Sequence, residues 1–84
     1  MRIFSIYDTK AKFFTQTIAE KNSASAERNF KTAVNTDGTD FKRYPEDYEL
    51  YELASFDNET GIVSPHSKPL LICSAAQLVQ IQDQ

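Results

Sequence analysis

The chain has 84 residues, of which 40% are hydrophobic and 25% charged, and its formal net charge at pH 7 is −3. This length predicts a single domain over residues 1–84, because a second hydrophobic core would not fit. The acidic balance argues against tight, nonspecific binding of duplex DNA, which depends on many phosphate contacts. Since a core of this size is thin, we expect a homodimer that buries further surface.

The charges are divided unevenly along the chain. Residues 1–43 hold eight Lys and Arg against five acidic residues, a net charge of +3. Residues 44–84 hold one Lys against seven acidic residues, a net charge of −6. This division allows a basic face on an acidic protein, and equally allows two opposite patches that meet in a homodimer.

The first third of the chain predicts two strands and a helix. Residues 2–8 are rich in β-forming side chains, with both faces apolar enough for a central strand. Residues 13–19 form a second, weaker β-rich stretch, in which we expect Phe14 to join the core. From Ser23 to Val34 the apolar residues recur with helical spacing, and Asn22 and Ser23 offer an N-cap. Gly38 then ends the helix.

The rest of the chain predicts a loop, a hairpin and a short helix. Residues 39–44 read as a loop, 48–56 as a strand, and 57–61 as a turn with Gly61 left-handed. Residues 62–64 return as a short strand that Pro65 stops. After the apolar run 70–73, residues 74–77 match a capping box that opens a C-terminal helix with Leu78 and Ile81 on one side.

These elements together predict an α+β fold. We expect a small antiparallel sheet of about four strands, with the helix Ser23–Val34 on one face and a short C-terminal helix, in the order β-β-α-β-β-(α).

No pattern in the sequence indicates an enzyme, a metal site or a cofactor. One Cys and one His make no zinc constellation, and we expect Cys73 to be a buried hydrophobic residue and His66 a solvated loop residue. The acidic residues in and before the third strand read as a solvated acidic edge; they are Glu46, Asp47, Glu49 and Glu52. We therefore predict no catalytic residues and no cofactor.

Basic and aromatic residues are interleaved on and after the main helix. Single-stranded nucleic acid is held by cations along its backbone and by aromatic rings stacked on its bases. The pattern suggests a weak, sequence-tolerant site for single-stranded DNA, while scattered surface cations and core aromatics are the alternative interpretation. The residues of the predicted site are Arg28, Lys31, Lys42, Arg43 and Tyr44.

An ordered set of segments resembles one family, the small nonstructural protein of gokushovirus-type Microviridae, which are single-stranded DNA phages. The segments that carry the resemblance are Arg2–Asp8, Ser23–Phe30, Phe41, Tyr44–Tyr48, Leu50–Leu53, Phe56–Asp57 and Thr60–Gly61. The resemblance is weak after Pro65.

The resemblance implies a non-enzymatic accessory role in a phage cycle, which by analogy is the switch toward single-stranded genome synthesis and packaging. Two classes of function follow: a binder of single-stranded DNA, or a protein-interaction module that acts on the host, the replication complex or the procapsid. No stretch predicts a signal peptide or a membrane span. We therefore expect the protein in the host bacterial cytoplasm and not as a stable component of the virion.

Overall fold

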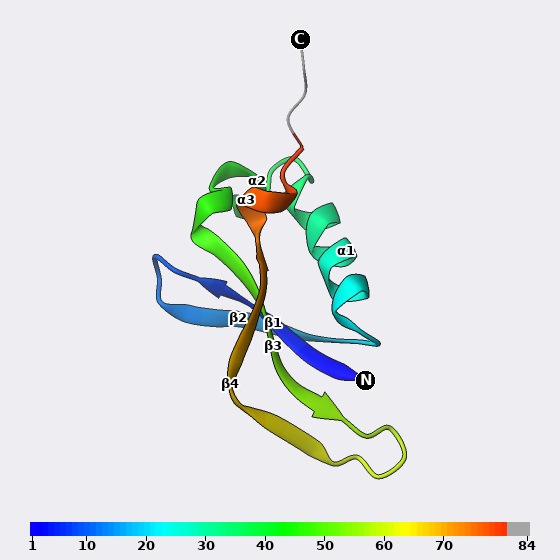
Figure 1. The fold of residues 1–84 in the computed structure, drawn as a ribbon. Helices are drawn as coiled ribbons and strands as arrows, with labels where there is room; N and C mark the ends of the chain where they lie inside the picture. Colours follow the sequence, from blue (N-terminus) through cyan, green and yellow to red (C-terminus); the bar gives the residue numbers. More distant parts are fainter. Residues whose placement is uncertain (81–84) are drawn as a thin grey trace.

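A computed structural model describes residues 1–80. The elements follow the predicted order, with an extra short helix and a 3-10 turn inserted before the third strand (Figure 1). Their bounds are β1 Arg2–Asp8, β2 Phe13–Glu20, α1 Ser23–Val34, α2 Asp40–Arg43, η1 Pro45–Asp47, β3 Tyr48–Phe56, β4 Val63–Ser74 and α3 Ala75–Leu78.

The four strands form one antiparallel sheet in the order β2-β1-β3-β4. The helix α1 lies against one face of this sheet, and the two short helices α2 and α3 lie together at one end (Figure 1). The predicted α+β fold is therefore confirmed, and β1 takes the central position that its two apolar faces indicated.

The helix α1 has the bounds that the sequence predicted. The Asn22 side chain caps it by accepting a hydrogen bond of 2.8 Å from the Ser25 amide. Its apolar side is buried at Ala26, Phe30 and Val34, and packs with strand residues such as Phe4 and Leu50 in one hydrophobic cluster. The helix is held by this packing, because a 12-residue helix is marginal on its own.

The predicted loop at 39–44 is wrong, because residues 40–43 form α2. Thr39 supplies the cap that makes this turn helical: its hydroxyl accepts a hydrogen bond of 3.2 Å from the Lys42 amide. Pro45 then starts the 3-10 turn η1, in which proline at the first position loses no hydrogen bond.

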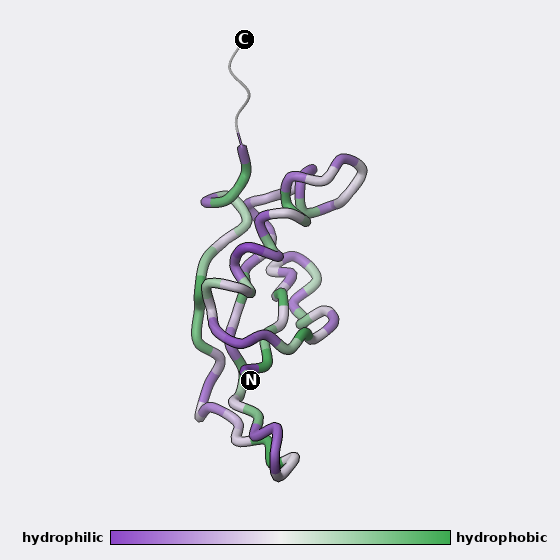
Figure 2. Tube along the Cα trace, turned by 90° about the vertical axis from the view of Figure 1, so that its right-hand side faces the viewer, coloured by the Kyte–Doolittle hydropathy of each residue, from purple (hydrophilic) through white to green (hydrophobic). Residues whose placement is uncertain are grey.

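The prediction of a strand that Pro65 stops is also wrong. The strand β4 runs for 12 residues through Pro65 and Pro69 and takes in the apolar run 70–73. This run is part of the green, hydrophobic stretch of the trace that leads up toward the C-terminus in Figure 2. Proline is tolerated there because β4 is an edge strand, so that its outer backbone groups need no partner in the sheet. The turn before it holds Gly61 at a φ of +77°, as predicted.

Three side chains lie in surroundings other than those predicted. His66 is not a loop residue but part of β4, where its Nε2 lies 2.6 Å from the Glu52 carboxylate. Glu52 is not part of a solvated edge but is 6% exposed on the interior strand β3. Phe14 is not a core residue but is 37% exposed, because β2 is the other edge strand.

The C-terminal helix α3 begins as the capping box predicted. The Gln77 side chain accepts a hydrogen bond of 2.8 Å from the Ser74 amide, and Cys73 is buried just before it. Leu78 packs against the hydrophobic cluster, whereas Ile81 lies outside the described residues. Within residues 1–80 no helix is long and apolar enough to cross a membrane.

Candidate nucleic-acid interface

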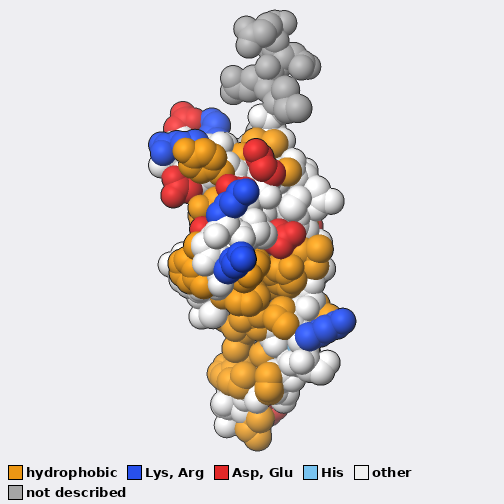
Figure 3. All heavy atoms as spheres, turned by 90° about the vertical axis from the view of Figure 1, so that its left-hand side faces the viewer, with side chains coloured by type: hydrophobic (Ala, Val, Ile, Leu, Met, Phe, Trp, Pro, Cys, Tyr) orange, Lys and Arg blue, Asp and Glu red, His pale blue; other side chains and the backbone are white. Residues whose placement is uncertain are grey.

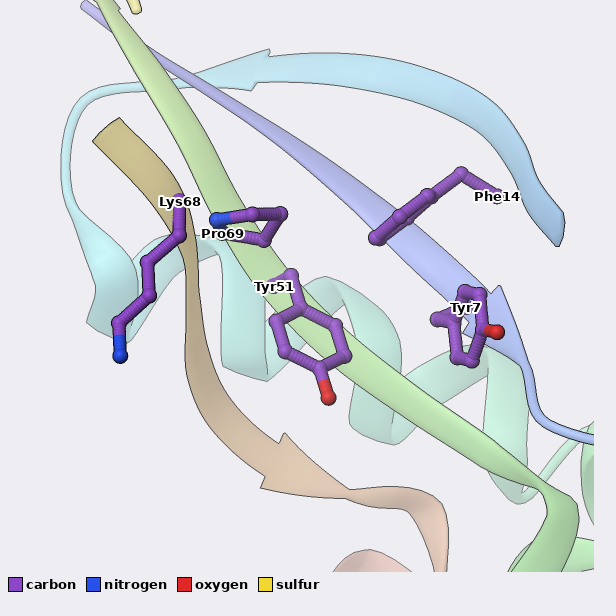
Figure 4. Close-up of a pocket in the computed structure, with 5 residues that line it drawn as sticks. All are labelled: Tyr7, Phe14, Tyr51, Lys68 and Pro69. Atoms are coloured by element: carbon purple, nitrogen blue, oxygen red, sulfur yellow. The ribbon is translucent and has the colours of Figure 1, made fainter. Parts of the chain in front are cut away.

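The face of the sheet that α1 leaves open carries a cluster of aromatic side chains. Tyr7, Phe14 and Tyr51 come from β1, β2 and β3, and with Lys68 and Pro69 of β4 they line a shallow hollow of about 330 Å³. Figure 4 shows these five side chains on the near side of the sheet, with α1 behind it. We call these five residues the aromatic face.

The three rings contact one another without stacking face to face. The Tyr7 and Phe14 ring centroids are 4.7 Å apart, and those of Phe14 and Tyr51 are 5.6 Å apart with the planes at 79°. Tyr7 and Tyr51 meet edge to face at 6.1 Å. Tilted and edge-to-face contacts of this kind are more favourable than a parallel, face-to-face stack of two rings.

A β-bulge brings these rings together. Ser5 pairs with Thr17 and Tyr7 pairs with Phe14, so that two residues of β2 lie opposite one residue of β1. The buried Ser5 hydroxyl lies 3.0 Å from the Gln16 carbonyl oxygen and 3.2 Å from the Thr15 carbonyl oxygen, which holds the bulge in place. The shift of one residue places Phe14 directly beside Tyr7, because register decides the face of each side chain.

The Tyr51 hydroxyl is held by an acidic neighbour. It donates a hydrogen bond of 3.1 Å to Glu49, two residues earlier on the same strand. Burial raises the pKa of Tyr51, and the hydrogen bond to Glu49 and its negative charge raise it further. The phenol is therefore neutral at physiological pH, and one carboxylate stands beside the aromatic face.

The side of the molecule away from α1 is broadly hydrophobic. Figure 3 shows this side, with a wide hydrophobic surface and separate Lys and Arg side chains around it. Outside the hollow, Leu71 pairs with Tyr51 across β3 and β4 and is 57% exposed. A contiguous exposed apolar surface is typical of an interaction site, whereas single exposed apolar residues are common on any protein surface.

The five residues of the sequence-predicted site lie elsewhere, in and after the helices. Arg28 and Lys31 line one hollow of about 360 Å³ along α1, together with polar residues such as Thr32. Since α1 covers the other face of the sheet, this hollow does not adjoin the aromatic face (Figure 4).

Lys42, Arg43 and Tyr44 follow one another at the end of α2. Lys42 forms an ion pair with Asp37, which lowers the pKa of that carboxyl, and Arg43 Nη1 lies 3.7 Å from Asp40 Oδ1. Both cations thus have acidic partners at the surface. Tyr44 is 49% exposed.

Sequence reasoning missed Tyr7, Tyr51 and Lys68 as members of a site. The available signal was strand alternation, since Tyr7 and Tyr51 occupy the phase opposite to the buried Phe4 and Leu50.

Among residues 1–80 no group of three His, Cys, Asp or Glu could hold a metal ion.

The family model described as "Phage ORF5 protein" matches residues 1–78 of the chain. No curated protein and no solved structure matches it.

Proposed function

Because the chain belongs to the phage ORF5 protein family, we propose that it is a non-enzymatic accessory protein that binds single-stranded DNA during viral genome synthesis or packaging. The resemblance in its strand and helix segments supports placing it with gokushovirus-type Microviridae. Its site of action on this proposal is the host bacterial cytoplasm, and it is not a stable component of the virion.

The observation that carries this proposal is the aromatic face. Aromatic rings on the open face of a four-stranded sheet are a recurring platform for unstacked bases. Tyr7, Phe14 and Tyr51 come from three adjacent strands, and their cluster offers aromatic surface to an unstacked base. Base–ring stacking tolerates any sequence, because every base has a π-face.

The charges around this face favour a weak interaction with single strands. Lys68 borders the rings and offers one contact to a phosphate, whereas Glu49 repels phosphate from the same side. The net charge of −3 adds to this repulsion. A rigid duplex keeps its bases stacked and presents only phosphates to such a surface, so we expect single strands to be preferred.

The experiment is fluorescence anisotropy with a labelled oligothymidylate at low salt. Tyr51→Ala should weaken binding by roughly five- to a hundredfold, the loss expected from one stacked base. Tyr51→Leu keeps an apolar side chain but removes the ring, and should weaken binding nearly as much. Unchanged binding in both variants would rule out the aromatic face as the DNA site.

A second candidate function is a protein-interaction module that acts on host, replication or procapsid proteins. The observation in its favour is the exposed aliphatic surface of β4 and its hairpin turn: Leu71, which pairs with Tyr51, is 57% exposed, and Ile62 and Val63 at the hairpin end are 61% and 49% exposed. A protein partner would tolerate Tyr51→Leu better than Tyr51→Ala, because burial of apolar area does not need a π-system. The same two variants therefore separate the two functions.

We also propose that the chain forms a homodimer, for the reasons of core size and charge division given above. Both sheet edges are poorly suited to strand addition, since β4 carries Pro65 and Pro69 and β2 carries the bulge. The contact proposed for this homodimer is therefore not an extension of the sheet. Light scattering at high micromolar concentration tests this proposal, and a monomer at that concentration would refute it.

A further inference from the structure

A second, smaller cavity lies on the other face of the sheet, between α1 and the strands β1 and β2. Its volume is about 150 Å³. Its walls are mostly apolar, and two amide side chains join them. The lining residues include Ile18, Phe30, Ala33, Phe41, Gln16 and Asn29. We call this cavity the α1–β2 slot.

Two aromatic side chains form part of the wall of the slot. Phe30 is 2% exposed and meets Phe41 edge to face at a centroid distance of 5.9 Å. A cavity of about 150 Å³ lined by Leu, Ile and Phe accepts one six-membered ring. The slot therefore fits a single planar ring better than a two-ring purine.

The two amides give the slot a polar rim. Asn29 donates one N–H to the Glu20 carboxylate at 2.9 Å, which orients its amide and uses one of its two N–H groups. Gln16 is exposed on β2. An amide presents a donor and an acceptor side by side, the pattern that the Watson–Crick edge of a pyrimidine requires.

From this combination we infer that the α1–β2 slot binds one pyrimidine base of the single strand. This inference rests on the proposed function, because the slot would select one base of a DNA strand whose other bases stack on the aromatic face without selection. Both sites share β2, which carries Phe14 on the open face and Gln16 and Ile18 beside the slot. A DNA strand that passes around the β2 edge of the sheet would reach both the aromatic face and the slot.

The test is an NMR titration of the full chain with thymidine, observing the methyl groups of Ile18 and Ala33. Both should shift and saturate with thymidine, and shift much less with 2′-deoxyadenosine. Ala33→Met fills the slot and should weaken thymidine binding at least about tenfold, the effect of forcing extra atoms into an occupied space. Asn29→Leu should weaken it roughly two- to tenfold, the contribution of one hydrogen bond.

The matched control is Thr32→Met, the same side chain placed one residue earlier on the exposed side of α1. It should leave the thymidine shifts unchanged, and circular dichroism should show that all three variants keep their helix. The inference is overturned if Ile18 and Ala33 do not move at saturating thymidine, or if 2′-deoxyadenosine moves them as readily.

The two proposals fail in different ways. If Tyr51→Leu abolishes oligothymidylate binding while thymidine leaves the slot unmoved, the aromatic face stands and the slot does not. If thymidine fills the slot while Tyr51→Leu leaves oligothymidylate binding intact, the slot stands and the proposed stacking role of the aromatic face does not.

Discussion

The Nε2 atom of His66 lies 2.6 Å from Oε2 of Glu52, and the two residues sit on neighbouring strands. The other carboxylate oxygen, Oε1, accepts a hydrogen bond of 3.2 Å from Arg2 on β1. Glu52 is buried, whereas Arg2 is half exposed. One buried carboxylate thus links β1, β3 and β4 through charged hydrogen bonds, which are stronger than neutral ones.

Removing this carboxylate should destabilise the sheet. We expect Glu52→Ala to lower the free energy of unfolding by about 1–3 kcal/mol, because the two hydrogen bonds that this buried carboxylate makes to neighbouring strands are lost. Glu59→Ala in the exposed turn after β3 is the control, and should change stability by less than about 0.5 kcal/mol. Urea denaturation followed by circular dichroism measures both. Equal effects would mean that the buried linkage adds nothing.

The ring of Phe30 is the centre of the contact between α1 and the sheet. It is 2% exposed and belongs to the main hydrophobic cluster. We expect Phe30→Ala to cost about 3–5 kcal/mol, through lost burial and the cavity left behind. Phe13→Ala removes the same side chain at a position that is 56% exposed, so its cost should be small. A thermal melt of Phe30→Ala that matches the parent would contradict the packing.

The sequence predicted those parts of the fold in which one local pattern decides the structure. The helix α1 has a clear helical period, a cap at Asn22 and a stop at Gly38, and its bounds were predicted to the residue. The turn at Gly61 and the start of α3 likewise depend on neighbours within three or four residues.

The parts that were predicted wrongly depend on distant partners. Glu52 falls in the buried phase of β3, and only Arg2 and His66, 50 and 14 residues away, explain why a carboxylate is stable there. Pro65 breaks a strand unless that strand lies at an edge, and strand order is a property of the whole sheet. Phe14 lies on the open face because of a bulge in β2 that Ser5 holds in place.

The thiol of Cys73 should be unreactive in the folded protein. Burial raises its pKa to about 12, and the nearby Glu27 adds to this effect. Since the thiolate is the reactive species, we expect a disulfide reagent at pH 8 to modify the native protein slowly and the urea-unfolded protein at once. Fast modification of the native protein would show that the site is open.

The same pKa shift predicts a loss of stability at alkaline pH. The ordinary pKa of this thiol is 9.0, and the folded value is about 12. Above pH 9 the unfolded chain releases the proton while the folded chain keeps it, so stability is full below pH 9 and falls between pH 9 and about 12. Cys73→Ala lacks this contribution. From pH 8 to pH 10 the urea midpoint of the parent should therefore fall relative to the urea midpoint of Cys73→Ala. A constant difference between the two midpoints at pH 8, 9 and 10 would contradict the shifted pKa.

Substitutions can separate the sequence-predicted cations from the aromatic face. Arg28 and Lys31 lie on α1 and the rings lie on the opposite face of the sheet, so that variants of one set leave the other in place. We expect each phosphate contact that is lost to flatten the slope of log K against log salt by about 0.7, whereas loss of a ring lowers affinity without changing that slope.

On the proposal that the DNA strand continues around the β2 edge to α1, the double variant Arg28→Glu/Lys31→Glu should reduce the salt slope of oligothymidylate binding. Lys42→Glu/Arg43→Glu should reduce it less, because Asp37 and Asp40 already neutralise these two cations in the parent. Tyr44→Ala should lower affinity by about 1–3 kcal/mol at a constant slope if its half-exposed ring stacks on a base. A salt slope that stays the same in both double variants would mean that phosphates are bound elsewhere, and Lys68 beside the aromatic face would then be the next residue to reverse.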